Sequence, residues 1–527
     1  MKMKNKIALF SALPILLIII SCCRKTSSIA PTLQGFQGDV WCFDMKNPIF
    51  KGLDINTLAK ISVRMPYGQG GKKLQTMQLS ISNPTVLKDI EKIDIYASAG
   101  IPDVTKATLV ASVTAIQNKM TIDCNTNLIS GENFFWLSCK AADNADVRNT
   151  ITLQCDNVQI ESFGTIAPKN ANALSPKYIG YALRQKGQDN IHTYRIPGIV
   201  TTNKGSLIAV YDNRYEGSGD LPANVDVGMS RSTDGGLTWQ PMKVIMDMGT
   251  GANEGIGDPS VLVDKKTGTI WVAALWSHGN RGWNGSGAGM TPDETGQFVL
   301  VKSEDDGVTW SQPINITPSV KTPSWRLFFQ GPGMGISMTD GTLVFPAQFR
   351  DADGMPFSTL IYSKNNGQTW QAGTGAKSNT TEAQVVELND GSIMLNMRDN
   401  RGGSRSVATT KDFGKTWTEH PTSRSALTEP ICMASIIRAA STKNGDLKNI
   451  LAFSNPNDTK DRKNLTIKLS LDEGNTWLEK NQLLIDERIC YGYSCMTMID
   501  KNTIGLLYEG VRDLYFVRIP IKDVLKD

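Results

Sequence analysis

Several residue types and patterns are scarce in this chain of 527 residues, and each shortage counts against a class of protein. There are only three histidines, none of them at metal-ligand spacing, which argues against a histidine-based metal site. The formal net charge is only +4 and no tract is rich in lysine or arginine, so a nucleic-acid partner has little support. No two cysteines have the C-x-x-C spacing of zinc and redox sites, and no long amphipathic helix stands out over residues 29–162.

Glycine, by contrast, is abundant. The chain has 47 glycines and 40% of its residues are hydrophobic, which fits an all-β globular protein with many turns. A chain of 527 residues also exceeds the size of a usual single core, so two domains are expected.

The N-terminus has the features of an export signal. Lys2, Lys4 and Lys6 precede an apolar run over residues 7–20, which is too short for a comfortable membrane span. The run ends in Ile-Ile-Ser-Cys22, which resembles a bacterial lipobox, so residues 1–21 are predicted to be a lipoprotein signal peptide and Cys22 to carry the lipid. The alternative is an ordinary secretory signal that is cleaved nearby. Both interpretations predict an exported protein, either anchored in a bacterial cell envelope through Cys22 or secreted.

Seven further cysteines follow Cys22 and Cys23. Because seven is an odd number, at least one of them stays unpaired. Disulfides are permitted in an exported protein, but the sequence does not reveal which cysteines would pair.

Residues 29–162 have the period-two pattern of short, half-buried strands. The clearest are residues 79–82, 93–96, 134–137 and 151–154. We predict a small antiparallel β-sandwich over residues 22–163, serving either as a carbohydrate-binding module or as a spacer packed on the second domain. Residues 164–177 lack periodicity and are predicted to be a linker, and the second domain is placed at residues 178–527.

An octapeptide of the form Ser-x-Asp-x-Gly-x-Thr-Trp occurs five times in the second domain. The copies begin at Ser232, Ser303, Ser363, Thr410 and Ser470, and their starts are 71, 60, 47 and 60 residues apart. This spacing suits one four-stranded propeller blade per copy. The Asp can accept hydrogen bonds from the turn, the Gly supplies a positive φ, and the Trp packs between hairpins. We therefore expect a structural motif without a catalytic role.

The segment Thr193-Tyr-Arg-Ile-Pro-Gly198, followed by these repeats, resembles the bacterial sialidases (neuraminidases). The resemblance covers roughly Tyr178 to Pro520. Sialidases of this type are retaining glycosidases built on a six-bladed β-propeller, often with an N-terminal β-sandwich. The resemblance therefore implies an all-β fold with a β-sandwich followed by a six-bladed propeller.

The resemblance also implies a site for the carboxylate of sialic acid. Arginine binds a planar carboxylate through two hydrogen bonds and stays charged, and sialidases use three arginines for this purpose. The matching residues are Arg195, Arg398 and Arg462. Glu509 matches the carboxylate that braces the first arginine, because three adjacent cations need a counter-charge; the alternative is a carboxylate at the rim.

Tyr493 matches the family nucleophile, a tyrosine that replaces the usual carboxylate in these enzymes. A phenol is a weak nucleophile at neutral pH and needs a base beside it. Glu382 matches that base and lies 16 residues before Arg398, as in the family pattern. Tyr491 is the rival for the nucleophile, and Glu387 is the rival for the base.

The remaining role is the acid that protonates the leaving oxygen and later activates water. Asp220, in a glycine-rich loop, matches this residue of the family. Glu216 and Asp226 are close alternatives. Arg214 matches an arginine that faces the hydroxyl side of the sugar.

The implied activity is an exo-α-sialidase that hydrolyses terminal sialic acid from glycoproteins, glycolipids or oligosaccharides, with retention and through a covalent tyrosyl intermediate. This chemistry requires no cofactor. Transfer to another sugar, or release of an anhydro product, would use the same residues. A sialoglycan-binding propeller without catalysis is the alternative from a different class, because the octapeptide also occurs in binding proteins.

Overall fold

A computed structural model describes residues 38–249, 251 and 253–526. The predicted signal peptide and the proposed lipid-carrying Cys22 lie outside these residues. Within the described ranges no helix is long and apolar enough to cross a membrane. The seven cysteines of the same ranges are all free thiols, and all but Cys490 are buried.

The N-terminal domain is a β-sandwich of two antiparallel sheets. The first sheet has the strand order β1 (Asp39–Asp44), β3 (Asn56–Met65), β8 (Gly131–Ala141), β5 (Ile90–Ala99) and β6 (Thr108–Val113). The second has the order β11 (Gly164–Ile166), β10 (Leu153–Ile160), β4 (Lys73–Ile81) and β7 (Lys119–Asn127). Alternate residues of both sheets, such as Ile61, Leu79 and Leu137, fill the core between them. The predicted sandwich is confirmed.

The segment predicted to be a linker, residues 164–177, lies along this sandwich. Its first residues form β11, which pairs with β10. Lys169 then pairs with β1: its carbonyl accepts from the amide of Cys42 and its own amide donates to the carbonyl of Val40, both at 2.9 Å. Backbone pairing therefore holds these residues to the edge of the sandwich.

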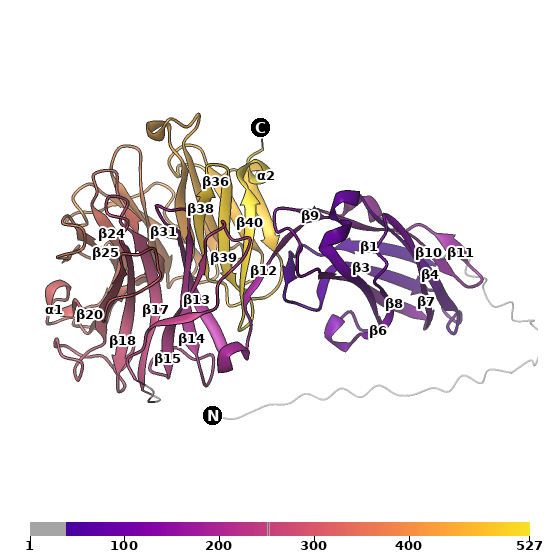
Figure 1. Cartoon of the computed structure of the whole chain (residues 1–527), viewed down its shortest axis with the longest axis horizontal. Helices are drawn as coiled ribbons and strands as arrows, with labels where there is room; N and C mark the ends of the chain where they lie inside the picture. Colours follow the sequence, from indigo (N-terminus) through magenta and orange to yellow (C-terminus); the bar gives the residue numbers. More distant parts are fainter. Residues whose placement is uncertain (1–37, 250, 252, 527) are drawn as a thin grey trace, which may run out of the picture.

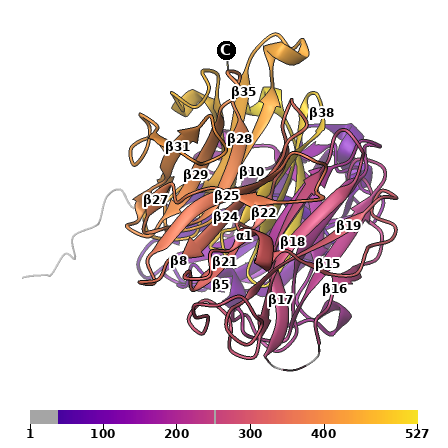
Figure 2. The same cartoon turned by 90° about the vertical axis from the view of Figure 1, so that its left-hand side faces the viewer.

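The second domain is a ring of six four-stranded blades (Figure 1; Figure 2 shows it in front of the sandwich strands β5, β8 and β10). The first blade contains β13 (Thr193–Thr201), β14 (Leu207–Arg214), β15 (Val225–Ser232) and β16 (Lys243–Met246). The second contains β17 (Glu254–Val263), β18 (Ile270–His278), β19 (Gln297–Ser303) and β20 (Ile314–Asn315), with β22 (Gly333–Met334) beside β17. The third contains β21 (Leu327–Gln330), β24 (Leu343–Arg350), β25 (Pro356–Ser363) and β26 (Gln371–Ala372), with β23 (Ile336–Ser337) and β27 (Lys377–Ser378) at its edges.

The fourth blade contains β28 (Thr380–Glu387), β29 (Ile393–Asp399), β31 (Ser406–Thr410) and β32 (Thr418–Glu419), and a small ladder of β30 (Gly403–Ser404) and β33 (Thr428–Glu429) lies apart from it. The fifth contains β34 (Ser435–Ala440), β35 (Ile450–Pro456), β36 (Leu465–Ser470) and β37 (Gln482–Asp486). The sixth contains β38 (Ser494–Asp500), β39 (Thr503–Glu509) and β40 (Leu514–Pro520), completed by β12 (Lys177–Arg184) from the start of the domain. Two short helices, α1 (Thr317–Val320) and α2 (Ile521–Val524), lie outside the blades. The predicted six-bladed propeller is confirmed.

The sandwich adds two short strands to the edge of the last blade. Strand β2 (Ile49–Lys51) pairs in parallel with β12. Strand β9 (Thr150–Ile151) pairs antiparallel with the beginning of β12, and Figure 1 labels both of these strands. Phe50 of β2 also stacks on Tyr515 of β40, with ring centroids 4.2 Å apart. Backbone pairing and a shared aromatic contact therefore fix the sandwich to the propeller.

The octapeptides form the turns that the sequence predicts. In the first copy, Asp234 accepts the backbone N–H groups of Leu237 and Thr238 at 3.0 and 2.9 Å, and the Thr238 hydroxyl at 2.6 Å. Gly236 has a φ of +85°, and the Trp239 ring meets Phe516 of the sixth blade edge to face at 5.0 Å. The motif thus closes its own turn and joins neighbouring blades.

Candidate active site

The first strands of the blades surround the hub of the propeller. Strand β13 contacts β17 and β38, and β34 contacts β28 and β38. Three of these strands have a register shift near their first residues, between Arg195 and Gly198, between Gly257 and Ser260, and between Thr380 and Ala383. A bulge of this kind redirects a side chain out of the regular alternation. The shifts bring Arg195, Asp258 and Glu382 to the same end of the hub.

Arg195 is held by Glu509. Its Nε donates to Glu509 Oε1 at 3.0 Å, and Glu509 has no exposed surface. The same carboxylate accepts the backbone N–H groups of Ile196 and Tyr493, both at 2.9 Å. Burial alone would lower the pKa of Arg195, but the charges of Glu509, Tyr493 and Asp220 raise it above its ordinary value. Glu509 therefore fixes the first arginine and the backbone of Tyr493 together.

Tyr493, Glu382 and Arg398 form one hydrogen-bonded group. The Tyr493 hydroxyl donates to Glu382 Oε1, and Arg398 Nη1 donates to Glu382 Oε2 at 2.6 Å and to the Tyr493 hydroxyl at 3.0 Å. Tyr493 is 4% exposed. Its burial and the charge of Glu382 raise the pKa of the phenol well above its ordinary value, against the opposing charges of Arg398 and Arg195. The free site therefore holds a neutral phenol with a proton acceptor in place.

The three predicted arginines converge on Tyr493. The Arg195 guanidinium lies 5.2 Å from the centroid of its ring, and that of Arg462 lies 5.7 Å from it. Arg462 is oriented by the carbonyls of Tyr491 and Ile431, at 2.9 and 3.0 Å. Arg398 is the arginine that contacts the hydroxyl itself.

Asp220 lies next to two of the cations. Its carboxylate accepts from Arg214 Nη1 at 2.7 Å and from Arg195 Nη1 at 3.3 Å. Arg214 also donates to the carbonyls of Ser218 and Gly219, at 2.8 and 2.9 Å, and so fixes the loop that carries the acid. Partial burial would raise the pKa of Asp220, but Arg214 and Arg195 outweigh that effect and lower it. The Asp220 side chain is 75% exposed, so it can meet a ligand from solvent.

Two of the rivals, Glu387 for the base and Asp226 for the acid, bind residues outside the hydrogen-bonded group of Tyr493. Glu387, at the far end of β28, accepts from the Thr339 amide and hydroxyl at 2.8 and 2.9 Å. Asp226 is 6% exposed and accepts from the Tyr215 hydroxyl at 2.7 Å; burial raises its pKa to about 6. Glu216 is exposed. Within the part of the chain that the structure describes, neither Glu387 nor Asp226 forms a hydrogen bond or ion pair with Tyr493, Arg195 or Arg398.

Tyr491 lies beside the site without occupying the position of the nucleophile. Its ring centroid is 4.9 Å from the Arg195 guanidinium, and its carbonyl holds Arg462. The hydroxyl that meets Glu382 belongs to Tyr493. The structure thus separates the two tyrosines that the sequence left as alternatives.

Asp258 is a residue of this site that the sequence analysis missed. It has a φ of +58°, in the bulge of β17, and its backbone amide donates to Asp212 Oδ1 at 2.8 Å. Burial, together with the charges of Asp212 and Asp220, raises the pKa of Asp258 well above its ordinary value, with Arg214 opposing. The sequence offers little at this position: the Gly-Asp-Pro at residues 257–259 lies inside β17 and belongs neither to the octapeptides nor to the Tyr-Arg-Ile-Pro segment.

A buried ion pair supports the second arginine from behind. Arg405 and Glu429 have no exposed surface, and Arg405 Nη1 donates to Glu429 Oε2 at 2.9 Å. Glu429 Oε1 accepts the backbone N–H of Asp399, the neighbour of Arg398, at 2.9 Å. This pair fixes the end of β29 from which Arg398 extends. Within the described ranges, no group of three or more His, Cys, Asp or Glu side chains is arranged to hold a metal.

Comparisons with known proteins match both domains. A family model described as a BNR repeat-like domain matches residues 196–485, and one described as the N-terminal domain of BNR-repeat neuraminidase matches residues 38–162. A sialidase of Bacteroides fragilis (strain YCH46) is 44% identical over 489 residues, which cover 89% of this chain and 90% of that protein. A sialidase of Micromonospora viridifaciens is 34% identical over 350 residues, which cover 64% of this chain and 53% of that protein. Among solved structures, the Hadza microbial sialidase Hz136 is 40% identical, with a TM-score of 0.85, and the match covers 92% of this chain and 100% of that one.

Proposed function

The chain belongs to the family of BNR-repeat sialidases (neuraminidases) and is a glycoside hydrolase of the exo-sialidase type. From this premise we propose that it releases terminal α-linked sialic acid with retention of configuration. The proposed route passes through a covalent intermediate on Tyr493. The substrates we propose are sialylated glycoproteins, glycolipids and oligosaccharides.

One observation carries this proposal. The Tyr493 hydroxyl donates to Glu382 and lies 3.0 Å from Arg398, with the guanidiniums of Arg195 and Arg462 about its ring. A sugar whose carboxylate met these arginines would place its anomeric carbon, which bears the carboxylate, close to the phenol oxygen. Holding the reacting atoms in this way removes much of the entropic part of the barrier.

The first step forms one bond and breaks another. The phenol oxygen of Tyr493 bonds to the anomeric carbon while its proton moves to Glu382, and the bond from that carbon to the leaving oxygen breaks. A tyrosine suits this step because it is uncharged when the anionic substrate arrives. Asp220 gives its proton to the leaving oxygen, so the aglycone departs as a neutral alcohol.

Asp220 must be protonated to act as the acid, although Arg214 and Arg195 lower its pKa in the free site. Substrate binding changes both the charge beside Asp220 and its exposure to solvent. The carboxylate of sialic acid offsets the charge of Arg195, and the sugar covers the exposed Asp220 side chain. Both changes favour the neutral acid, since burial and loss of a neighbouring cation each raise a carboxyl pKa.

The second step reverses the first with water in place of the aglycone. Asp220, now a carboxylate, takes a proton from a water molecule whose oxygen bonds to the anomeric carbon. The bond to the Tyr493 oxygen breaks, and Glu382 returns the proton to the phenolate. Two displacements at the same carbon give net retention.

The stereochemical course tests this proposal. Proton NMR during hydrolysis of a sialoside should detect the α anomer of free sialic acid first, with the β anomer growing in as the sugar equilibrates. Initial appearance of the β anomer would show inversion and would exclude a covalent tyrosyl route.

We further propose that the protein is exported and anchored to a bacterial cell envelope through a lipid on Cys22. The support is the basic and apolar character of residues 2–20 and the Ile-Ile-Ser-Cys22 sequence. A Cys22→Ser variant should move from the membrane fraction to the soluble fraction while it keeps sialidase activity. Unchanged membrane association of that variant would exclude this anchor.

A further inference from the structure

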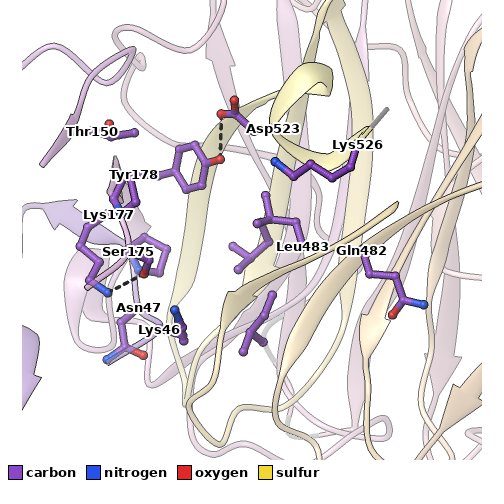
Figure 3. A pocket seen from close by; sticks show the side chains of 14 residues that line it. Lys46, Asn47, Thr150, Ser175, Lys177, Tyr178, Gln482, Leu483, Asp523 and Lys526 are labelled. Atoms are coloured by element: carbon purple, nitrogen blue, oxygen red, sulfur yellow. Dashed lines mark hydrogen bonds between the residues drawn. The ribbon is translucent and has the colours of Figure 1, made fainter. Parts of the chain in front are cut away.

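A cavity of about 460 Å³ lies where the sandwich meets the propeller, away from the hub (Figure 3). The sandwich contributes residues 46–48 and Thr150, and the propeller contributes residues 482–485 of β37 with Asp523 and Lys526. Between them, Ser175 and Pro176 precede β12, and Lys177 and Tyr178 begin it. We call it the joint cavity. Its volume lies within the range of about 300–1,000 Å³ that is usual for small-molecule sites, which often form between domains.

One buried acceptor in the wall of the joint cavity has no partner. Asn47 is 6% exposed, and its Oδ1 accepts no hydrogen bond from the described residues. Its Nδ2 makes only a long contact of 3.4 Å to the Thr57 carbonyl. Figure 3 shows the Asn47 side chain at the edge of the cavity, beside Lys46. Buried polar atoms are nearly always paired, so this oxygen calls for a donor that the chain does not supply.

The opposite wall presents acceptors and donors together. Asp523 accepts from the Tyr178 hydroxyl at 2.9 Å through Oδ2, and Lys526 lies at the exposed rim (Figure 3). A sugar hydroxyl can donate and accept at once, so it suits a carboxylate and an ammonium that lie near each other. Pro48, Pro176 and Leu483 supply apolar surface between these polar groups.

The charges about the joint cavity are close to balanced. Asp44 forms ion pairs with both Lys46, at 2.5 Å, and the buried Lys177. Asp523 and Lys526 add one charge of each sign. Asp44 does not line the cavity and already pairs with two of its lysines, so a doubly charged phosphate would meet the Asp523 carboxylate and a single lysine, Lys526, that forms no ion pair with the described residues. The wall holds one aromatic ring, that of Tyr178, whose hydroxyl donates to Asp523. This combination favours a neutral, polyhydroxylated ring.

We propose that the joint cavity is a second, non-catalytic site that binds a neutral pyranose sugar. Asn47 Oδ1 accepts one hydroxyl, Asp523 and Lys526 hold another, and Leu483 with the prolines contacts the C–H face of the ring. The sugar is either a free monosaccharide or the outermost unit of a glycan chain. Binding here does not depend on the hydrolytic mechanism, because none of the hub residues lines the cavity.

Saturation-transfer difference NMR on the whole chain tests this site with galactose and N-acetylgalactosamine as free sugars, and with a desialylated oligosaccharide as the glycan source. We expect transfer from the protein to the protons of at least one of these probes. A signal from the oligosaccharide alone would assign the site to glycan chains, and a signal from the free sugars as well would assign it to monosaccharides.

Leu483→Trp should fill the joint cavity and remove the transfer signal. Leu478→Trp is the matched control, because Leu478 is 50% exposed and does not line the cavity, and it should leave the signal intact. Lys526→Ala and Asp523→Asn, which do not depend on a large side chain fitting into the wall, should each weaken binding about tenfold, the loss expected for a hydrogen bond to a charged group. All four variants should hydrolyse a small fluorogenic sialoside at the parent rate.

Absence of transfer from every neutral probe would overturn the proposal. So would transfer that persists unchanged in both Lys526→Ala and Asp523→Asn. Sialic acid is included as a reference for the hub: its signal should survive in Leu483→Trp, whereas a joint-cavity signal should not.

Discussion

The octapeptide turns and the hub both contain carboxylates held by several hydrogen bonds, but the partners come from different places. In the turns the partners belong to the same eight residues, and hydrogen bonds from Thr309 and Thr416 hold the pKa of Asp305 and of Asp412 at about 2. At the hub the partners come from different blades. Glu509 joins Arg195 to the backbone of Tyr493, and Glu382 joins Tyr493 to Arg398.

The pKa shifts separate the two regions in the same way. The turn carboxylates shift in one direction, toward the ionised form, because the hydrogen-bond donors of the turn outweigh burial, which would raise the pKa. Neighbouring hub groups shift in opposite directions: the pKa of Asp220 is lowered and that of Asp258 is raised. Groups with pKa values driven apart are typical of acid–base sites, and uniform shifts are typical of structural turns. Changes in the turns should therefore affect stability, and changes at the hub should affect catalysis or the support of the arginines.

The largest effect on stability should come from the buried ion pair behind Arg398. Arg405→Met leaves Glu429 buried without its counter-charge, which should lower the free energy of unfolding by about 3–5 kcal/mol. Urea denaturation followed by tryptophan fluorescence measures this loss. Arg424→Met is the control: Arg424 is one-third exposed and lies 3.3 Å from Asp399, so its loss should cost about 1 kcal/mol or less. An equal loss of unfolding free energy in the two variants would contradict the claim that the Arg405–Glu429 pair stabilises the end of β29.

Tyr493→Phe should abolish most catalysis without a comparable loss of stability. The variant keeps the ring between the arginines but has no nucleophile, so the rate should fall by at least about two to three orders of magnitude. Turnover of a fluorogenic sialoside measures the effect. Tyr491→Phe is the matched control, because its ring and its carbonyl contact to Arg462 remain, and its rate should stay close to that of the parent. A Tyr493→Phe variant with near-normal turnover would refute the assignment.

Asp226→Asn should change stability and leave catalysis intact. The folded pKa of Asp226 is about 6, above the value of about 3.9 expected for an unfolded chain. The unfolded state therefore loses its proton first, and the parent loses stability as the pH rises from about 4 to about 6, by about 2–3 kcal/mol. Asparagine does not titrate, so the variant should gain that amount over the parent between pH 4 and pH 7 in denaturation experiments. A strong loss of turnover would instead restore Asp226 as a candidate for the acid.

Asp234→Ala should give the smallest effect, on stability alone. It removes the acceptor for two backbone amides and a hydroxyl in one octapeptide turn, which should lower the free energy of unfolding by about 1–2 kcal/mol, as for the loss of a helix cap. The turnover of the folded fraction should match that of the parent. A loss of turnover at a temperature where the variant is fully folded would contradict the claim that the octapeptide turns affect stability alone.

The same difference explains how much could be predicted from the sequence. The octapeptide turns are local, so their carboxylates, glycines and tryptophans could be predicted from eight residues at a time, and their number and spacing indicated a propeller. The convergence of the hub residues is non-local, and no sequence pattern sets the distances between them: Arg195, Arg398, Arg462, Glu382 and Tyr493. Only the resemblance to sialidases brought these residues together.

The residues that the sequence analysis missed belong neither to a local octapeptide nor to the motifs that resemble sialidases. Asp258 lies outside the octapeptides and reaches the hub through a bulge, which leaves no periodic trace. The contact between the domains depends on β2 and β9, strands of three and two residues, which are too short to produce an alternating pattern. Residues 164–166 and Lys169, within the predicted linker, pair with the sandwich through backbone groups, which composition does not report.

A fluorinated sialoside that slows the second step would test the central claim most directly, by trapping the sugar on the enzyme. After digestion with trypsin, residues 489–501 form one peptide that contains both Tyr491 and Tyr493, so fragment ions must separate the two positions. The account predicts one sialyl group per molecule, carried by the Tyr493 oxygen, with Tyr491 unmodified. An adduct on Glu382 or Tyr491, or complete inhibition with no covalent adduct on the intact protein, would contradict it.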